Sequence, residues 1–252
     1  NIRITAQLVD AISGHHLWAE RYDRDLNEIF AVQDELTKKI ITAMQVELTE
    51  GEQARVDAKG TNNLEAYLKY LKARENINKL NAEGNALGKE LAQQAIDLDS
   101  QFAMAYRILA AGYRMDMFLG TSKSPKQSMG MCIKLLKKAI ELDETYAEAY
   151  GALGFTFSII GKHDEAIATA EKAISLDPNS ANTYLMLGHT FRSADRQKEA
   201  IWAYTKAIRL NPIPPSIYFS GLGMSYGLAG QYEEGIKWCE KAVRESPDNY
   251  IA

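Results

Sequence analysis

Three short stretches of this sequence carry residue types that could support chemistry. The adjacent histidines His15 and His16 suggest a metal site, and GLGMSYG at residues 221–227 nearly spells a glycine motif that binds phosphate. A third stretch, residues 163–165, combines histidine, aspartate and glutamate. Each stretch would need a particular secondary structure to position it, so the surrounding elements decide between chemistry and packing.

The predicted elements favour a structural explanation for all three stretches. Adjacent strand residues point to opposite faces, so His15 and His16 cannot chelate one ion together. Residues 221–227 follow no predicted strand, and their glycines fall where packed helices need small residues. Residues 163–165 open a predicted helix, whose positive end suits acidic side chains. No nucleophile motif appears. We therefore expect a non-catalytic protein without metal or cofactor, and a function that lies on its surfaces.

Composition limits the kinds of partner that the surface of this protein can bind. The chain has 252 residues, of which 46% are hydrophobic and 25% charged, as in ordinary folded domains. A net charge of -4 argues against nucleic acid as a partner, because phosphate binding needs a basic face. No apolar run is long enough to span a bilayer, and no signal peptide opens the sequence. We expect no membrane contact and a cytoplasmic location, with the periplasm as the alternative if a membrane segment lies upstream.

The first 50 residues predict a hairpin followed by a long helix. Apolar residues alternate with polar ones from Ile2 to Leu8, a turn signal follows at Ser13-Gly14, and a second alternating run covers residues 17–22. Residues 27–48 then carry an apolar stripe at helical spacing. The polar residues 51–63 are expected to be a linker.

The rest of the chain repeats itself with a period of 34 residues. Residues 147–180 and 181–214 align as two such units, and the pattern returns between 216 and 249 after one extra residue, Pro215. Seven positions match in the first two units: Tyr150/Tyr184, Leu153/Leu187, Gly154/Gly188, Phe157/Phe191, Ala166/Ala200, Ala173/Ala207 and Pro178/Pro212.

Each unit is expected to be a pair of antiparallel helices, A and B. Small residues allow the two backbones to approach, and proline ends helix B because it lacks an amide donor. Units 64–102 and 103–146 follow the pattern with five and ten extra residues between their helices. Since one unit cannot bury its apolar face alone, all five must stack. The predicted fold is mainly α, a solenoid of five helix pairs after an N-terminal β-hairpin and long helix.

The ten extra residues of the second unit allow two interpretations. Residues 117–130, MFLGTSKSPKQSMG, form a protruding loop between helices A and B that could contact a partner. Alternatively, the apolar residues 117–119 extend helix A and pack against the neighbouring insertion near residues 77–87.

Two resemblances follow from these motifs. The 34-residue pattern resembles the tetratricopeptide repeat, which identifies residues 64–252 as a repeat array. Residues 1–50 resemble the end of the TolB-like amino-terminal domain that precedes such arrays in bacterial signalling proteins, including class III adenylate/guanylate cyclases and winged-helix regulators. That likeness rests on Gly14, residues 17–23, Ile29-Phe30 and residues 33–35. It implies that the chain is a fragment, whose parent could carry a cyclase domain.

The repeat resemblance implies a protein or peptide ligand in a concave groove. The groove is expected to be lined by A-helix positions between the packing ones. These are Lys72, Met104, Arg107, Arg114, Phe155, Leu185, His189, Arg192, Ser220 and Met224. Arginine mixed with methionine, phenylalanine and leucine suits a peptide interface. Some repeat domains clamp a peptide carboxylate with lysine and asparagine. In repeats two to four of this sequence, the first clamp position is occupied by Arg107, Gly151 and Leu185, and the second clamp position has no asparagine. This pattern argues against a receptor for chaperone tails.

A second hypothesis is self-assembly. The strand predicted over residues 2–10 has an apolar face and unpaired backbone groups along one edge, so a homodimer could form between two equivalent hairpins. A catalytic or nucleotide-binding domain is a third hypothesis, for which no motif is present.

Overall fold

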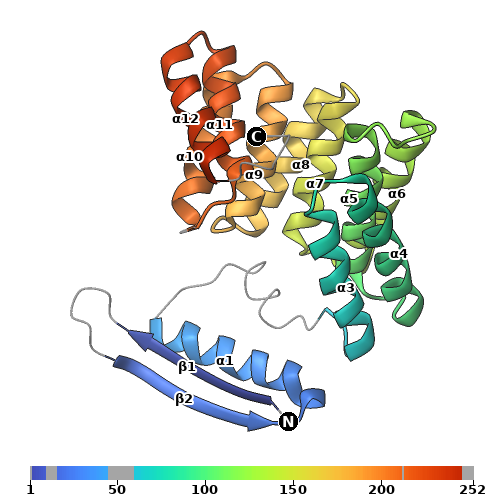
Figure 1. Ribbon diagram of the computed structural model, residues 1–252, viewed down its shortest axis with the longest axis vertical. Coiled ribbons are helices and arrows are strands. Elements are labelled where there is room, and N and C mark those ends of the chain that lie inside the picture. The colour runs from blue at the N-terminus through green and yellow to red at the C-terminus, as the bar shows by residue number, and fades with distance from the viewer. Residues whose placement is uncertain (1, 10–15, 45–59, 212, 246–252) are drawn as a thin grey trace.

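The computed structural model describes residues 2–9, 16–44, 60–211 and 213–245. Within them the chain forms a two-stranded hairpin, one long helix and five helix pairs (Figure 1), which confirms the predicted mainly α class. The hairpin strands are β1 (Ile2–Val9) and β2 (His16–Arg24), followed by a short 3-10 turn, η1 (Leu26–Glu28), and by α1 (Ile29–Met44). The pairs are α3 (Leu64–Ile77) with α4 (Ala82–Leu98), α5 (Ala103–Phe118) with α6 (Pro125–Leu142), α7 (Ala147–Ile159) with α8 (His163–Leu176), α9 (Ala181–Ser193) with α10 (Gln197–Leu210), and α11 (Ser216–Leu228) with α12 (Tyr232–Glu245).

Helix α1 gives the hairpin a partner to pack against. The strands are antiparallel, with Ile4 opposite Tyr22, and burial alternates along β1 as the period-two pattern predicts. Tyr22 of β2 and Val32 of α1 are buried, and the Lys39 side chain of α1 forms an ion pair with Glu20 of β2. A lone hairpin cannot bury a face by itself, so α1 supplies the missing layer. The predicted turn at residues 13–14 lies outside the described residues.

The A helices end at residues with left-handed backbone conformation. Gly161, Asp195 and Gly230 have φ of 79°, 58° and 77° in the three regular repeats, where they reverse the chain between helices A and B. Leu80 and Gly120 have the same sign of φ in the two longer repeats. Glycine adopts this conformation without a Cβ penalty, which explains three of the five residue types.

Glycines on the A helices mark the predicted close contacts. A Cβ atom added to Gly154 would lie 2.8 Å from the carbonyl oxygen of Ala166, and one added to Gly188 would lie 2.9 Å from the Tyr204 ring. Ala166 and Tyr204 are fully buried on the facing B helices. Both glycines therefore allow an approach that no larger residue would permit.

The buried apolar side chains form two clusters along the array. The first cluster contains side chains from the four helices α3, α4, α5 and α6 and includes Leu153 of α7. The second cluster contains Ala170 of α8 and side chains from α9, α10 and α11. The division falls within the third helix pair, between α7 and α8.

The extra residues of the second repeat lengthen its helices. Helices α5 and α6 contain 16 and 18 residues, against 13 and 14 in α7 and α8. Helix α5 continues through Phe118 and α6 begins at Pro125, so only residues 119–124 connect them. The hypothesis of a protruding loop over residues 117–130 is wrong, because helices α5 and α6 cover most of that range. The alternative is confirmed in that Met117 and Phe118 extend helix A, but the Phe118 ring stacks on Phe155 of α7 and not on the insertion near residues 77–87.

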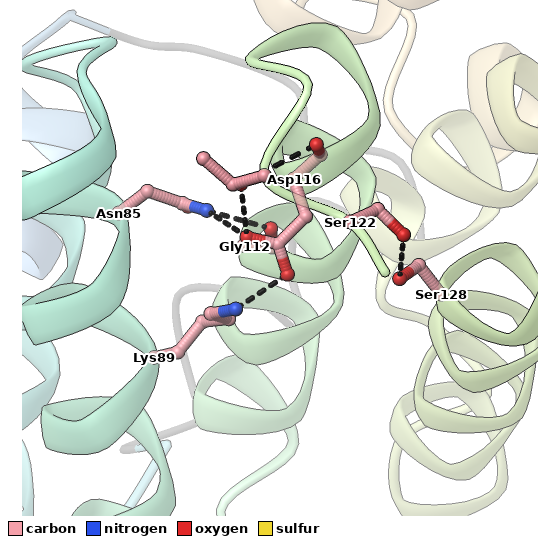
Figure 2. Close-up of polar contacts among 7 residues, drawn as sticks. Asn85, Lys89, Gly112, Asp116, Ser122 and Ser128 are labelled. Atoms are coloured by element: carbon pink, nitrogen blue, oxygen red, sulfur yellow. Dashed lines mark hydrogen bonds and ion pairs between the residues drawn. The ribbon is translucent and has the colours of Figure 1, made fainter. Parts of the chain in front are cut away.

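A polar network holds the extended end of α5 against the first repeat (Figure 2). The Asn85 side-chain amide donates to Asp116 Oδ1 at 2.7 Å and to the Gly112 carbonyl at 3.1 Å, and Lys89 forms an ion pair with the same carboxylate. The Thr121 hydroxyl also donates to Asp116, at 3.0 Å. Asn85 and Asp116 are buried, so the network replaces the water that these groups lose. It anchors the connection between α5 and α6.

Candidate functional site

Side chains from successive repeats stack into a row of rings. The Phe118 and Phe155 rings have centroids 6.5 Å apart with planes 10° from parallel, and Phe155 lies 4.8 Å from the His189 imidazole. Tyr204 of α10 meets His189 edge-on, with its hydroxyl 2.7 Å from His189 Nδ1. We call Phe118, Phe155, His189 and Tyr204 the aromatic row. It connects α5, α7, α9 and α10.

The aromatic row passes from the core to the surface. Tyr204 is fully buried and His189 is 6% exposed, whereas Phe155 is half-buried and Phe118 is 52% exposed. The inner end is therefore fixed by packing, and the outer end offers apolar ring surface to a ligand. Rigid rings of this kind provide contact area at a small cost in conformational entropy.

Two arginines lie beside the row. The Arg114 guanidinium lies 5.2 Å from the Phe155 ring centroid, a cation–π distance, and Arg192 contacts the Met224 sulfur of α11. Across the described residues, neither arginine forms an ion pair with a carboxylate. Burial, Arg192 and Arg114 together lower the pKa of His189 to about 3. The imidazole is therefore neutral at physiological pH, between two cationic side chains.

Arg107 differs from these two arginines because it has its own partners. Its Nε donates to the Tyr146 hydroxyl at 2.7 Å, and its Nη2 lies 3.1 Å from a carboxylate oxygen of Glu148. Burial acts to lower the pKa of Arg107, but Tyr146 and Glu148 outweigh it and the pKa rises. Arg107 thus joins α5 to the start of α7 and its charge is already balanced.

The structure divides the ten predicted groove residues. It brings Arg114, Phe155 and His189 together, and Arg192 with Met224. Lys72 is exposed on α3, and Met104 packs against the core cluster of the first repeats, with no contact to the aromatic row.

Three of the expected groove residues need correction, because His189, Leu185 and Ser220 are buried. Leu185 is 4% exposed and belongs to the second core cluster, while Ser220 is 3% exposed and donates to the Ile217 carbonyl. Each occupies the A-helix position equivalent to Gly151, which is also buried, so this position faces the adjacent repeat. Neither side chain is available to a ligand.

Sequence reasoning missed the two ends of the aromatic row. Phe118 lies beyond the point where a regular A helix ends, so it has no equivalent in the other repeats. Tyr204 lies on a B helix, which the groove expectation did not include. The run of apolar residues at 117–119 was the available signal for the first.

Comparison with known proteins identifies the class of this domain. Residues 147–180, 181–214 and 218–249 match the tetratricopeptide repeat family. These three segments, which lie in α7 to α12, therefore carry tetratricopeptide repeats. The crystal structure of TTC0263, a thermophilic protein of this class from Thermus thermophilus, superimposes with a TM-score of 0.53 at 17% identity. The match covers 84% of this chain and 97% of that one, and it shows the fold.

One relative is an adenylate cyclase by name. "Putative adenylate cyclase 3" of Rhizobium meliloti (strain 1021) is 37% identical over 165 residues. The matched segment is 66% of this chain and 28% of the relative, so the chain spans less than a third of that protein. A MamA crystal structure is 25% identical, with a TM-score of 0.43, over 72% of this chain and 92% of its own.

Two absences among the described residues concern membrane spans and metal sites. No helix in the described ranges is both long and apolar enough to cross a membrane. Within the same ranges, no group of three or more histidine, cysteine, aspartate or glutamate side chains has the arrangement of a metal site.

Proposed function

We propose that this chain is a regulatory, protein-binding module of a cytoplasmic bacterial signalling protein related to adenylate and guanylate cyclases. Residues 1–50 are the end of a TolB-like domain, and residues 64–252 are the array that binds a protein or peptide. The similarity to an adenylate cyclase by name supports the signalling assignment. The observation that carries the binding assignment is the aromatic row with its exposed Phe118 end.

The surface beside the row has the composition of an interface core. Phe118 and Met224 are 52% and 41% exposed, and Arg114 and Arg192 border the same stretch of A helices. Aromatic rings, methionine and arginine are enriched where proteins bind one another, and a few such residues supply most of the affinity. A peptide lying across α5, α7, α9 and α11 would contact all four helices.

Selection from a displayed library of random dodecapeptides tests this function. We expect enriched peptides whose affinity for the Phe155→Ala variant falls at least tenfold in fluorescence anisotropy, because the variant removes the central ring of the row. Trp202→Ala is the matched control, since Trp202 is 54% exposed on α10 and meets Tyr184 edge-on instead. Unchanged affinity in the Phe155→Ala variant, with an unchanged melting temperature, would refute binding at this surface.

Self-assembly through the hairpin is the second candidate. In the described sheet β1 pairs with β2 alone, so the other edge of β1 has unpaired backbone groups. Such an edge is a template for pairing with an equivalent strand of a second molecule.

A further inference from the structure

The arginines near the aromatic row occupy a repeated position. Arg114, Ser158 and Arg192 are equivalent residues in the second, third and fourth repeats, near the C-terminal end of each A helix. Two cationic side chains therefore project from alternate repeats, and the repeat between them carries a small, buried serine. Phe155 and His189 lie one helical turn earlier, so the half-buried Phe155 ring shares one stretch of surface with the charges, and the buried His189 ring packs against Phe155.

The charge of these arginines is not balanced within the described residues. Arg107, on the same helix as Arg114, has Glu148 at 3.1 Å, whereas Arg114 and Arg192 have no such carboxylate. Arg114 Nη1 is also buried without a hydrogen-bond partner. The neighbouring thiol of Cys132 supplies no counter-charge, because burial raises its pKa and keeps it neutral. The chain carries a net charge of -4, so this local excess of positive charge runs against the overall balance.

A desolvated guanidinium is stabilised best by a carboxylate. Charge-assisted hydrogen bonds between arginine and carboxylate are short, directional and about twice as strong as neutral ones. The Phe155 and Phe118 rings are apolar and partly exposed, so they favour an apolar side chain. The two chemistries lie side by side on this surface.

We propose that the array recognises an acidic peptide in which a carboxylate stands next to an apolar side chain. The carboxylates pair with Arg114 and Arg192, and the apolar side chain packs on Phe155 and the exposed Phe118. This inference rests on the proposed function and names the chemistry of its ligand. The carboxylate belongs either to an aspartate or glutamate side chain or to the C-terminus of the peptide.

Two displayed libraries of random dodecapeptides distinguish these sources. One library has both peptide ends attached or blocked, and the other has a free C-terminus. If the carboxylate is a side chain, we expect the first library to yield peptides with aspartate or glutamate next to leucine, phenylalanine or methionine. If it is the C-terminus, we expect enrichment in the second library only, with an apolar last residue. Amidating the C-terminus of a selected synthetic peptide then leaves affinity unchanged in the first case and abolishes it in the second.

Charge-removing variants locate the carboxylate on the protein. We expect Arg192→Gln to weaken a selected peptide about tenfold and Arg192→Lys to restore part of that affinity. Affinity for the unmodified chain should also fall as salt rises, because the pairing is electrostatic. Arg209→Gln removes an equal charge from an exposed position on α10 and should have no effect. Arg114→Gln is the second variant, and circular dichroism checks that it folds.

The outcomes separate this inference from the proposed function. Neutral or basic peptides that lose affinity in the Phe155→Ala variant would refute the acidic ligand and leave peptide binding in place. Acidic peptides that bind Arg114→Gln and Arg192→Gln as tightly as the unmodified chain would also refute it. Peptides that are indifferent to Phe155→Ala would refute binding at the aromatic row, and with it this inference, whereas no enriched peptide at all would refute the proposed function itself.

Discussion

Glycine in this array has opposite effects depending on what faces its missing Cβ. At Gly154 the nearest atoms are the backbone carbonyl of Ala166 at 2.8 Å and the Ala170 nitrogen at 3.0 Å, which cannot move without shifting a helix. At Gly130, within α6, nothing lies within 4 Å. One substitution, glycine to alanine, therefore distinguishes packing from helix propensity.

We expect Gly154→Ala to destabilise the array by about 1–3 kcal/mol through overpacking. Gly130→Ala is the matched control and should stabilise it by about 0.5–1 kcal/mol, since alanine loses less backbone entropy in a helix. Urea unfolding followed by circular dichroism measures both changes. A destabilising Gly130→Ala, or a neutral Gly154→Ala, would show that the helix contact is not as close as the structure has it.

His189 makes stability depend on pH. Its pKa is about 3 in the folded chain, against about 6.5 when unfolded. The unfolded state therefore binds more protons than the folded state between these pH values. The neutral His189 imidazole contributes fully to the free energy of unfolding above pH 6.5, and this contribution is lost as the pH falls towards 3. Each pH unit in that interval costs about 1.4 kcal/mol.

Melting temperatures at pH 7 and pH 5 test this linkage. We expect the unmodified chain to lose more stability over the interval than His189→Gln, which has no imidazole to protonate. His163→Gln is the control, because His163 is exposed at the start of α8. An equal pH response in the unmodified chain and in His189→Gln would contradict the buried, neutral imidazole.

Among the elements, α4 and α5 are joined by charge as well as by packing. Asp116 lies in the extra turn of α5 and accepts hydrogen bonds from Asn85 and Thr121 besides its ion pair with Lys89. The extra turn therefore has a buried polar anchor that the regular repeats do not need. Removing Asp116 would leave the Asn85 amide and the Lys89 ammonium without this acceptor.

A double-mutant cycle measures the pair directly. We expect Asp116→Ala and Lys89→Ala to show a coupling energy of about 1–3 kcal/mol in urea unfolding, because the carboxylate is buried. The exposed pair Lys138 and Glu141 of α6 is the matched control and should couple by less than about 0.5 kcal/mol. Equal coupling in the two cycles would mean that the network of Figure 2 contributes no more than a surface ion pair.

The sequence was sufficient to predict the helix pairs, but it was insufficient to predict which side chains meet on the surface. Ala166, Ala200 and Gly154 recur at fixed spacing because every helix pair needs the same close contact, so their periodicity predicted the fold. The aromatic row does not recur. Phe118 reaches Phe155 because α5 is one turn longer than a regular A helix, and a period of 34 contains no information on that turn. Leu185 fills a position where arginine stands in another repeat, and only packing shows that it faces inward.

At the scale of the whole chain, the hairpin offers two modes of association. The β1 edge favours pairing with a second molecule, whereas Phe30 of α1 meets Tyr67 of α3 at 5.0 Å, a contact that favours docking within one chain. The self-assembly hypothesis predicts a dimer by light scattering at micromolar concentration. Thr5→Lys with Gln7→Lys, on the exposed face of β1, should convert it to a monomer by like-charge repulsion. A monomeric unmodified chain would end this hypothesis.

The two core clusters meet within the third helix pair, and the aromatic row crosses that boundary. Phe155 belongs to α7, on the side of the first cluster, while His189 and Tyr204 stand with the second. In a linear array, each part unfolds with a stability set by its own contacts and by those of its immediate neighbours. A peptide seated on Phe118 and Phe155 and paired with Arg192 would touch both halves at once. We expect the amide protons of α3–α7 and of α8–α12 to exchange at separate rates in the free chain. A bound peptide would make the two halves unfold as one unit, so that these protons would exchange together in the complex.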